Sequence, residues 1–275
     1  MDLQAVKSTV DADLKVTIVG VGQVGMACAY SILNQNIASE ITLFHFILFT
    51  GEKLKGEMMD MQHGLLFCKP VKISAGTDFA ITSGSKLVII TAGARQQEGQ
   101  SRLDLCQQNT QILESLIPSL AKHSPNAVLL VVSNPVPIWS GVKVGGVRLL
   151  DIYPNFISEN ENLKESCKDL HREVVNSAYE IIKLKGYTNL AIGLSVANIS
   201  RCILQNTGAI RPVSTLVKGL YGMENEVFLS LPCALGSQGV TDVMTLHLNS
   251  EEMRLLQKSC KTLESVQSTL QFSSS

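Results

Sequence analysis

The sequence feature that most constrains the fold is a glycine-rich turn near the N-terminus. Gly20, Gly22 and Gly25 form the pattern G-x-G-x-x-G between an apolar stretch at 14–19 and small, apolar residues at 26–33. A strand that enters such a turn and a helix that leaves it are typical of a dinucleotide-binding unit. In that unit the first glycine permits the tight turn, the second lets the backbone approach a pyrophosphate, and the third allows close helix–strand packing. We therefore predict that these glycines bind a cofactor; the alternative is a glycine-rich turn that binds no ligand.

Strands and helices are expected to alternate over the first half of the chain. Apolar stretches rich in β-branched residues predict strands, and amphipathic stretches between them predict helices. The expected strands lie at 14–19, 41–46, 71–74, 86–91 and 127–132, and the expected helices at 26–33, 53–64 and 103–122. Because the strands are apolar throughout, they indicate a parallel sheet that is covered on both faces.

The second half of the chain has a different pattern. Helices are expected at 163–185, 190–206 and 251–271, and strands of a small mixed or antiparallel sheet at 213–218, 227–232 and 240–248. The fold class that we expect is α/β. It consists of a Rossmann-type parallel sheet, truncated after its fifth strand, followed by a partial α+β domain.

Composition excludes several classes of function. Lys and Arg number 23 and Asp and Glu 24, without a basic run, so we expect no nucleic-acid partner. The 7 cysteines form no C-x-x-C pair, which argues against a zinc site and favours a reduced compartment. No apolar signal core begins the chain, and its longest apolar run, at 41–49, is too short to span a bilayer. We expect a cytoplasmic protein with no metal site and no membrane partner.

His45 departs from the dinucleotide-binding pattern. An acidic residue usually ends the second strand of such a unit and binds the ribose hydroxyls of the adenosine. Here His45 occupies that position, between Phe44 and Phe46. Imidazole cannot replace both hydrogen bonds of a carboxylate, and the loss of a charged hydrogen bond costs roughly 1.5–3 kcal/mol. We therefore expect weakened cofactor binding.

Long stretches of the chain resemble the L-lactate dehydrogenases, within the wider lactate and malate dehydrogenase superfamily. The most specific are KVTIVGVGQVGMACA at 15–29, KLKGEMMDMQHG at 53–64, SKLVIITAGARQQEG at 85–99, VVSNPV at 131–136 and SAYEIIKLKGYTNLAIGLSVA at 177–197. The resemblance covers nearly the whole chain. Malate dehydrogenases usually carry a second arginine where this chain has Gln96 and Gln97, so a malate-type activity is the less favoured alternative.

The resemblance implies NAD as the cofactor and several residues that contact it. Gly20, Gly22 and Gly25 would bind its pyrophosphate. The residues implied along the rest of the cofactor cleft are Thr91, Ala92, Gly93, Arg95 and Asn134.

The resemblance also implies residues that contact a small 2-keto or 2-hydroxy acid, pyruvate or lactate. Arg102 matches the mobile-loop arginine that polarises the substrate carbonyl, and is the one catalytic residue that carries over. Asn134 would lie near the substrate oxygen, and Thr188 would line the substrate pocket. Thr188 could instead cap the helix that follows it.

A block that the resemblance leads us to expect after Val136 is missing. Val136 is followed at once by Pro137, Ile138 and Trp139, although a parallel strand at 127–132 needs a crossover of a dozen or more residues before another strand joins it. In the family this block contains a helix, a sixth strand, the arginine that clamps the substrate carboxylate and the catalytic histidine. We therefore expect an N-terminal arm at 1–13, an NAD-binding Rossmann domain at 14–136 and the remnant of a substrate domain at 137–275.

None of the five histidines is expected to replace the missing one. His45 would lie at the adenosine end of the cleft, His63 and His123 at helix ends, His171 within a helix and His247 in a strand of the second domain. Loss of a general acid typically lowers the rate of the reaction by a factor of ~10²–10⁴.

Three hypotheses follow for the activity of the chain. The first is NAD-dependent interconversion of L-lactate and pyruvate, the oxidoreductase reaction that the family carries out in glycolysis. The second is a pseudoenzyme that binds NADH weakly or joins the homo- or hetero-oligomers of an intact relative, since the resemblance implies tetramers. The third is an unstable product without a molecular role.

Overall fold

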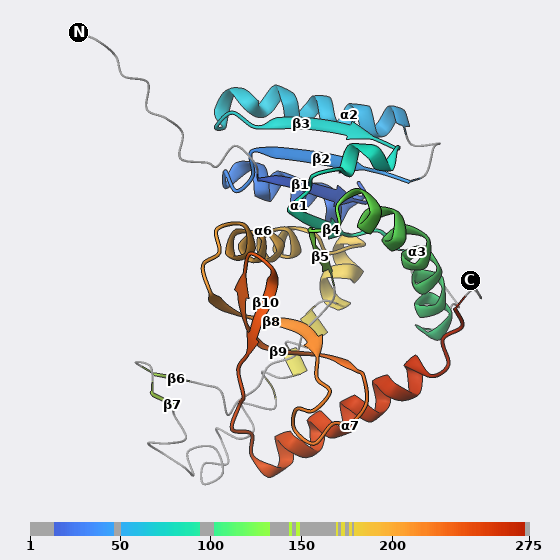
Figure 1. The fold of residues 1–275 in the computed structure, drawn as a ribbon, viewed down its shortest axis with the longest axis vertical. Helices are drawn as coiled ribbons and strands as arrows, with labels where there is room; N and C mark the ends of the chain where they lie inside the picture. Colours follow the sequence, from blue (N-terminus) through green and yellow to red (C-terminus); the bar gives the residue numbers. More distant parts are fainter. Residues whose placement is uncertain are drawn as a thin grey trace.

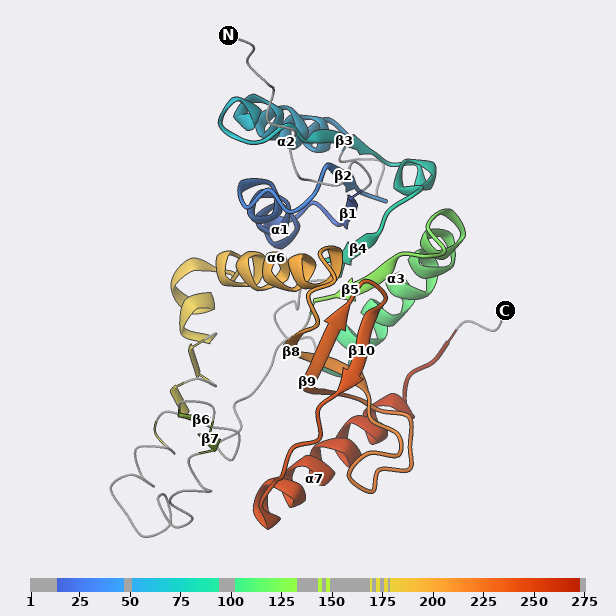
Figure 2. The same cartoon turned by 60° about the vertical axis from the view of Figure 1, so that its left-hand side comes forward.

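The computed structural model describes residues 14–46, 51–93, 102–132, 143–144, 147–148, 169, 172–173, 176–177 and 179–272. A parallel sheet with its helices forms one end of the molecule, and a second, antiparallel sheet with a long C-terminal helix forms the other (Figure 1). Helix α6 lies between the two sheets in Figures 1 and 2.

The first sheet has five parallel strands in the order β3-β2-β1-β4-β5. The strands are β1 (Lys15–Val19), β2 (Glu40–Phe44), β3 (Lys72–Gly76), β4 (Leu87–Ile90) and β5 (Val128–Val131). This order confirms the expected Rossmann-type parallel sheet. Because all five strands run in the same direction, their carboxyl ends meet at a single edge of the sheet, where ligands bind in open α/β folds.

Helices cover both faces of this sheet, as the apolar strands predict. Helix α1 (Gln23–Asn34) and helix α2 (Gly51–His63) pack on one face through one buried cluster that also holds residues of β1 and β2. Helix α3 (Arg102–His123) packs on the other face through Leu116 and Leu120. Two short 3-10 helices, η2 (Gly64–Phe67) and η3 (Phe79–Thr82), connect these elements.

The second half of the chain packs against the first through α6 (Leu190–Leu204). Helix α6 lies alongside α1 (Figure 2), and Val196, Ala197 and Ile203 join the cluster that α1 forms with the parallel sheet. The backbones approach so closely that a Cβ atom built on Gly193 would lie 2.6 Å from the Ala27 carbonyl oxygen. One apolar core therefore runs through both halves.

An antiparallel sheet and a terminal helix follow α6. The sheet has the order β10-β9-β8, with β8 (Ala209–Leu216), β9 (Phe228–Gly236) and β10 (Gly239–Val243). Helix α7 (Ser250–Gln267) begins with a capping box between Asn249 and Glu252. A two-residue pair, β6 (Lys143–Val144) and β7 (Val147–Arg148), is a small hairpin that the sequence pattern did not predict.

The strand that we expected at 240–248 is too long. Strand β10 ends at Val243, and the stretch from Met244 to Asn249 is irregular before α7 begins. His247 therefore lies in a connecting segment and not in a strand, because this segment leaves the sheet to reach the amino end of α7.

Strand β5 lies at the edge of the parallel sheet and is only half covered. Val128 and Leu130 pack against the core that α1 and α6 share. Leu129 and Val131 point to the opposite face and are 37 % and 51 % exposed. Within the described residues, nothing continues the sheet beyond β5, so this strand presents apolar side chains that a further element would normally cover.

An ion-pair network at the start of β2 gives a testable dependence of stability on pH. The Glu40 carboxylate lies 3.3 Å from the Lys15 ammonium and 3.1 Å from the Lys72 ammonium. Burial raises the pKa of Glu40, but the hydrogen bond from Lys72 and the charge of Lys15 outweigh it, so the pKa lies below its usual value.

We expect Glu40→Gln to lower the free energy of unfolding by about 0.5–1 kcal/mol at neutral pH. Because the folded-state pKa is depressed, this contribution is present above the unfolded pKa of about 4.3 and is lost as the pH falls through the folded value. Denaturant unfolding of both proteins at decreasing pH measures it. A stability difference that stays constant into the acid range would show that the charge of Glu40 does not contribute.

Candidate cofactor site

Gly20 makes the tight turn that follows β1. Its N–H donates to the Phe44 carbonyl oxygen at 2.9 Å, which ties the turn to the end of β2. Its φ angle is +95°, a conformation that favours glycine, and a Cβ atom there would lie 2.8 Å from the Ala92 nitrogen. The turn is therefore fixed between the ends of β2 and β4.

Gly25 holds α1 against this turn. A Cβ atom at Gly25 would lie 1.8 Å from the Gly20 carbonyl oxygen and 2.8 Å from the Thr91 hydroxyl. The Thr91 hydroxyl donates to the same Gly20 oxygen at 2.8 Å. The absence of a side chain at Gly25 thus lets the helix, the turn and the end of β4 meet.

Gly22 faces open space at the amino end of α1. It is the exposed N-cap residue of the helix and makes no side-chain cap. The amino end of a helix carries the positive end of the helix dipole, which favours an anionic ligand. A Cβ atom at Gly22 would meet nothing within 4 Å. The space that this Cβ would enter is where a pyrophosphate approaches the backbone, so the turn fits a dinucleotide.

Thr91, Ala92 and Gly93 follow β4 directly and lie beside the glycine turn. Thr91 and Ala92 contact it, as described above, and Gly93 is exposed at the same edge. A Cβ atom at Gly93 would lie 3.2 Å from the Asn109 side-chain oxygen of α3. The sequence pattern gave no signal for Asn109, because its contact depends on how α3 packs.

Three of the expected site residues are not described in full. Arg95 and Asn134 lie outside the described residues. Arg102 is the first residue of α3, and the position of its side chain also lies outside the described part. Their roles remain predictions.

The structure brings the segment that contains Thr188 to the same end of α1. The side-chain amide of Asn189 donates to the Gln23 carbonyl oxygen at 3.4 Å, and Gln23 is the first residue of α1. The N-cap residue of α6 is Asn189, so the alternative that Thr188 caps this helix is wrong. The sequence did not single out Asn189, since its contact joins residues 166 positions apart.

His45 lies at the end of β2, on the other side of β1 from β4 and β5. The His45 N–H donates to the Gly76 carbonyl oxygen at 3.2 Å, and the imidazole is half-buried. Burial lowers the pKa of His45, and the positive charge of Lys53 lowers it further. His45 therefore lies on the opposite side of β1 from Thr91.

The other described histidines lie away from this edge of the sheet. His63 ends α2 and His123 ends α3, and helices that follow parallel strands return to the amino edge. The His123 ring is held there by the Ser119 carbonyl oxygen, 2.9 Å from Nδ1. His247 lies between β10 and α7, and His171 lies outside the described residues.

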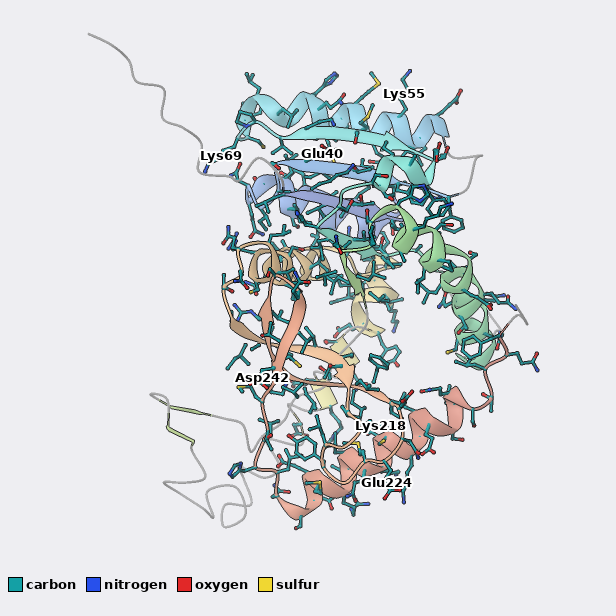
Figure 3. The ribbon with its side chains drawn as sticks, in the orientation of Figure 1. Glu40, Lys55, Lys69, Lys218, Glu224 and Asp242 are labelled. Atoms are coloured by element: carbon teal, nitrogen blue, oxygen red, sulfur yellow. The ribbon has the colours of Figure 1, made fainter. Side chains whose placement is uncertain are left out.

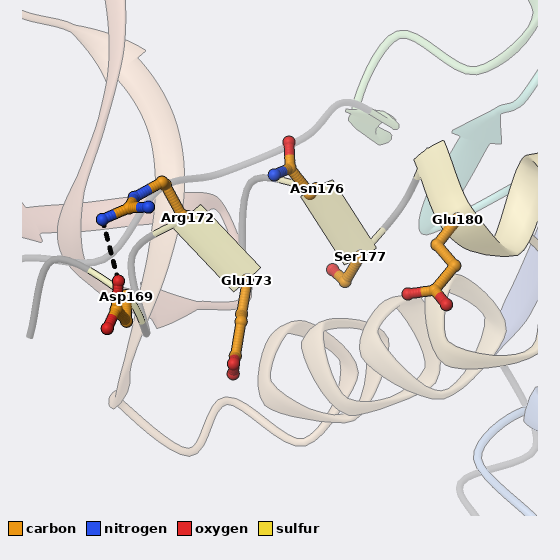
Figure 4. A pocket seen from close by; sticks show the side chains of 6 residues that line it. All are labelled: Asp169, Arg172, Glu173, Asn176, Ser177 and Glu180. Atoms are coloured by element: carbon orange, nitrogen blue, oxygen red, sulfur yellow. Dashed lines mark ion pairs between the residues drawn. The ribbon is translucent and has the colours of Figure 1, made fainter. Parts of the chain in front are cut away.

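Two pockets formed by described residues lie away from the glycine turn. Figure 4 shows the first, which is lined by polar side chains spaced as on one face of a helix: Asp169, Arg172, Glu173, Asn176, Ser177 and Glu180. Its ion pair between Asp169 and Arg172, at 2.8 Å, is exposed at both partners. The second pocket lies at the amino ends of β1 and β4, beside Leu14 and Lys86. The first pocket lacks the apolar walls expected of a substrate cleft, whereas Ile203 and Leu204 also line the second.

No group of His, Cys, Asp and Glu among the described residues could hold a metal ion. No helix in this part of the chain is long and apolar enough to cross a membrane.

The fold and the turn together define a class of protein. A parallel sheet of this order, with a G-x-G-x-x-G turn between β1 and α1, belongs to the α/β proteins that bind dinucleotides. Comparison with known proteins narrows the class. Residues 14–146 match the lactate/malate dehydrogenase NAD binding domain, and residues 132–271 match the lactate/malate dehydrogenase alpha/beta C-terminal domain. The chain belongs to the lactate/malate dehydrogenase family, and NAD is its cofactor, as expected.

Curated relatives agree with this assignment. The chain is 45 % identical to the L-lactate dehydrogenase A chain of Trachemys scripta elegans over 316 aligned positions, covering 94 % of each protein. It is 44 % identical to that of Caiman crocodilus apaporiensis, again over 94 % of both. It is 45 % identical to that of Ambystoma mexicanum, over 95 % of this chain and 94 % of the relative.

The alignment with these relatives is longer than the chain itself. It spans 316 positions with the Trachemys protein, whereas the chain has 275 residues. The alignment therefore includes positions at which this chain has no residue. The two domain matches also overlap at 132–146, which is the region where the sequence pattern placed the missing block.

Proposed function

We propose that this chain is an L-lactate dehydrogenase-like protein that binds NAD(H) but converts lactate and pyruvate poorly or not at all. The main observation behind this proposal is that the alignment with L-lactate dehydrogenase A chains has more positions than this chain has residues. The overlap of the domain matches at 132–146 supports a deletion there, between a Rossmann domain at 14–136 and the rest of a substrate domain at 137–275. The edge position of β5, with Leu129 and Val131 exposed, supports the same proposal.

The residues present are suited to holding the cofactor. Gly22 and the amino end of α1 would bind the pyrophosphate, and Thr91 to Gly93 would line the cleft toward the nicotinamide. When bound, NAD accepts a hydride from lactate or, as NADH, donates one to pyruvate. Arg102 would polarise the substrate carbonyl, and Asn134 and Thr188 would lie beside the substrate.

The chemistry lacks a proton carrier and a clamp for the substrate. Oxidation of lactate requires a base to take the hydroxyl proton, and reduction of pyruvate requires an acid to return it. Histidine suits both roles because its pKa lies near neutrality. The described histidines do not lie at the nicotinamide side of the turn, and the expected arginine pair with the substrate carboxylate has no counterpart in the sequence around Val136. Hydride transfer would therefore lack both proton transfer and orientation.

A titration of the purified chain with NADH tests the binding part of this proposal. We expect saturable fluorescence enhancement, with affinity about tenfold to a hundredfold below an intact L-lactate dehydrogenase A chain, because His45 replaces an acid. The control is the same titration of heat-denatured protein, which is expected to show none. Absence of saturation in the native protein would exclude a cofactor-binding role and favour an unstable product.

A second candidate function is association with copies of itself or of an intact relative. The observation that favours it is the exposure of the neighbouring residues Leu66 and Phe67 in η2, at 86 % and 87 %. Exposed apolar side chains that lie together often mark an interface between proteins. Size-exclusion analysis of the chain, alone and mixed with an intact L-lactate dehydrogenase, tests this; elution as a monomer in both samples would exclude it.

We also propose a reduced, cytoplasmic location and a lactate rather than malate substrate type. The described cysteines are all free thiols, which supports the location. The curated relatives are L-lactate dehydrogenases, which supports the substrate type, as do Gln96 and Gln97.

A further inference from the structure

A cavity lies at the amino ends of the parallel strands, on the edge of the sheet opposite the glycine turn. Its volume is about 420 Å³, within the ~300–1,000 Å³ typical of small-molecule sites. The residues that line it come from the parallel sheet, from the end of α6 and from the turn between β9 and β10. No described residue of the cofactor cleft is among them.

Contacts within and between the two halves of the chain hold the walls of this cavity. The Val128 N–H donates to the Lys86 carbonyl oxygen at 3.0 Å, which sets the starts of β4 and β5 side by side. A Cβ atom built on Gly239 would lie 3.4 Å from a methyl carbon of Val128, so the turn before β10 packs on the start of β5. The Ser237 N–H donates to the Asn206 side-chain oxygen at 2.9 Å, which ties this turn to the segment that follows α6. The cavity therefore lies between the two halves.

The inner part of the cavity is apolar. Ile203 is 3 % exposed, and Leu14 and Leu204 are half-buried. Carbon that moves from water against such side chains gains the free energy of the hydrophobic effect. The inner part is thus suited to the apolar body of a ligand.

The outer part of the cavity is polar and positively charged. Its residues Lys86, Asn126, Ser237 and Gln238 are exposed, and no acid is among the described residues that line the cavity. Within the described part of the chain, the side chains of Lys86, Asn126 and Gln238 make no hydrogen bond or ion pair, so a ligand need not displace a protein partner. An ammonium and two carboxamides supply N–H donors, and a charged donor makes a strong hydrogen bond to a carboxylate.

We propose that this cavity binds a small organic anion with an apolar body, of the class of a medium-chain carboxylate. Lys86 and the two carboxamides would bind the carboxylate, and the apolar inner wall would cover the carbon chain. Because both halves of the chain form the walls, the ligand would stabilise their packing against each other. The site and the cofactor cleft lie at opposite edges of the parallel sheet, so the two can be occupied together and the proposal does not depend on NAD binding.

Calorimetric titration of the purified chain with octanoate tests this site. We expect saturable binding and a Tm that rises with the octanoate concentration, because a ligand that binds only the folded state stabilises it. Octanol, which has a carbon chain of the same length and no charge, is expected to bind at least about threefold more weakly. Saturation with NADH is expected to leave the octanoate affinity unchanged.

Two substitutions of exposed residues test the charge requirement without altering the core. Lys86→Gln is expected to weaken octanoate binding by about threefold to tenfold and to leave octanol binding unchanged. Gln238→Glu keeps the size of the side chain and adds a negative charge, so it is expected to weaken octanoate binding by a similar factor, about threefold to tenfold. Circular dichroism melting shows whether each variant is folded.

Lys55→Gln is the matched control for Lys86→Gln. Lys55 points outward from the exposed side of α2 (Figure 3) and does not line the cavity. Its substitution removes the same charge from the chain and is expected to change neither the octanoate nor the octanol affinity.

The outcomes distinguish an anion site from other kinds of binding. Lack of saturable octanoate binding by the folded chain, equal affinities for octanoate and octanol, or equal effects of Lys86→Gln and Lys55→Gln would overturn the proposal. Displacement of octanoate by NADH would also overturn it, because octanoate would then bind in the cofactor cleft. Octanoate binding that both rim substitutions weaken, and that Lys55→Gln and NADH leave unchanged, would support it.

Discussion

Replacement of Gly25 by alanine is expected to abolish dinucleotide binding and to lower the free energy of unfolding by about 1–3 kcal/mol. The added Cβ would lie 1.8 Å from the Gly20 carbonyl oxygen, so backbone must move. That oxygen also accepts the Thr91 hydroxyl at 2.8 Å, so the movement disturbs the junction of turn, helix and β4. NADH titration and denaturant unfolding measure the two effects.

Gly22→Ala is the matched control for Gly25→Ala. Its Cβ would meet nothing within 4 Å, so the stability of the unliganded protein is expected to change by less than about 0.5 kcal/mol. NADH binding is nevertheless expected to weaken by about tenfold or more, because the methyl group enters the space of the pyrophosphate. Equal losses of stability in both variants would contradict the different roles assigned to these glycines.

Gly193→Ala is the second substitution with a large expected effect. The Cβ would lie 2.6 Å from the Ala27 carbonyl oxygen and 2.9 Å from the Ser31 hydroxyl, so α6 and α1 must separate. Overpacking of this kind costs about 1–3 kcal/mol, which outweighs the roughly 1 kcal/mol that alanine gains over glycine inside a helix. Thermal unfolding is expected to show a lower Tm and earlier loss of structure in the second half of the chain.

Gly56→Ala in α2 separates packing from helix propensity. Gly56 is also inside a helix, but its Cβ would meet nothing within 4 Å. Here alanine is expected to raise the free energy of unfolding by about 0.5–1 kcal/mol. A stabilised Gly193→Ala protein would contradict the close packing of α6 on α1.

The parallel sheet was predictable because its strands are short, apolar and separated by helices. Lys86 to Thr91 is the clearest example, since a run of β-branched residues ends at a glycine, and β4 occupies Leu87–Ile90. The packing of α6 on α1 was not predictable, because Gly193 looks like any glycine in an apolar helix until Ala27 is placed opposite it. Contacts of this kind join residues far apart in the sequence and leave no local pattern.

In the site, too, residues whose roles depend on local sequence were predictable, and residues placed by distant contacts were not. The spacing of Gly20, Gly22 and Gly25 predicts the role of each glycine, because each role depends on the local turn or on the helix that follows it. The position of Asn189 depends on how α6 packs beside the turn, and the sequence pattern did not single it out. His45 was identified from sequence because it stands where a strand ends, a position that the hydrophobic pattern marks directly.

The most direct test of the proposed function is pyruvate-dependent NADH oxidation by the purified chain, measured beside an intact L-lactate dehydrogenase A chain. The lack of a proton donor alone costs ~10²–10⁴ in rate, and the lack of a substrate clamp adds to this loss. We therefore predict turnover at least about 10⁴-fold below the intact enzyme, with dinucleotide binding retained. Turnover within about a thousandfold of the intact enzyme would contradict the account, because the combined loss of a proton donor and a substrate clamp is expected to cost more than that.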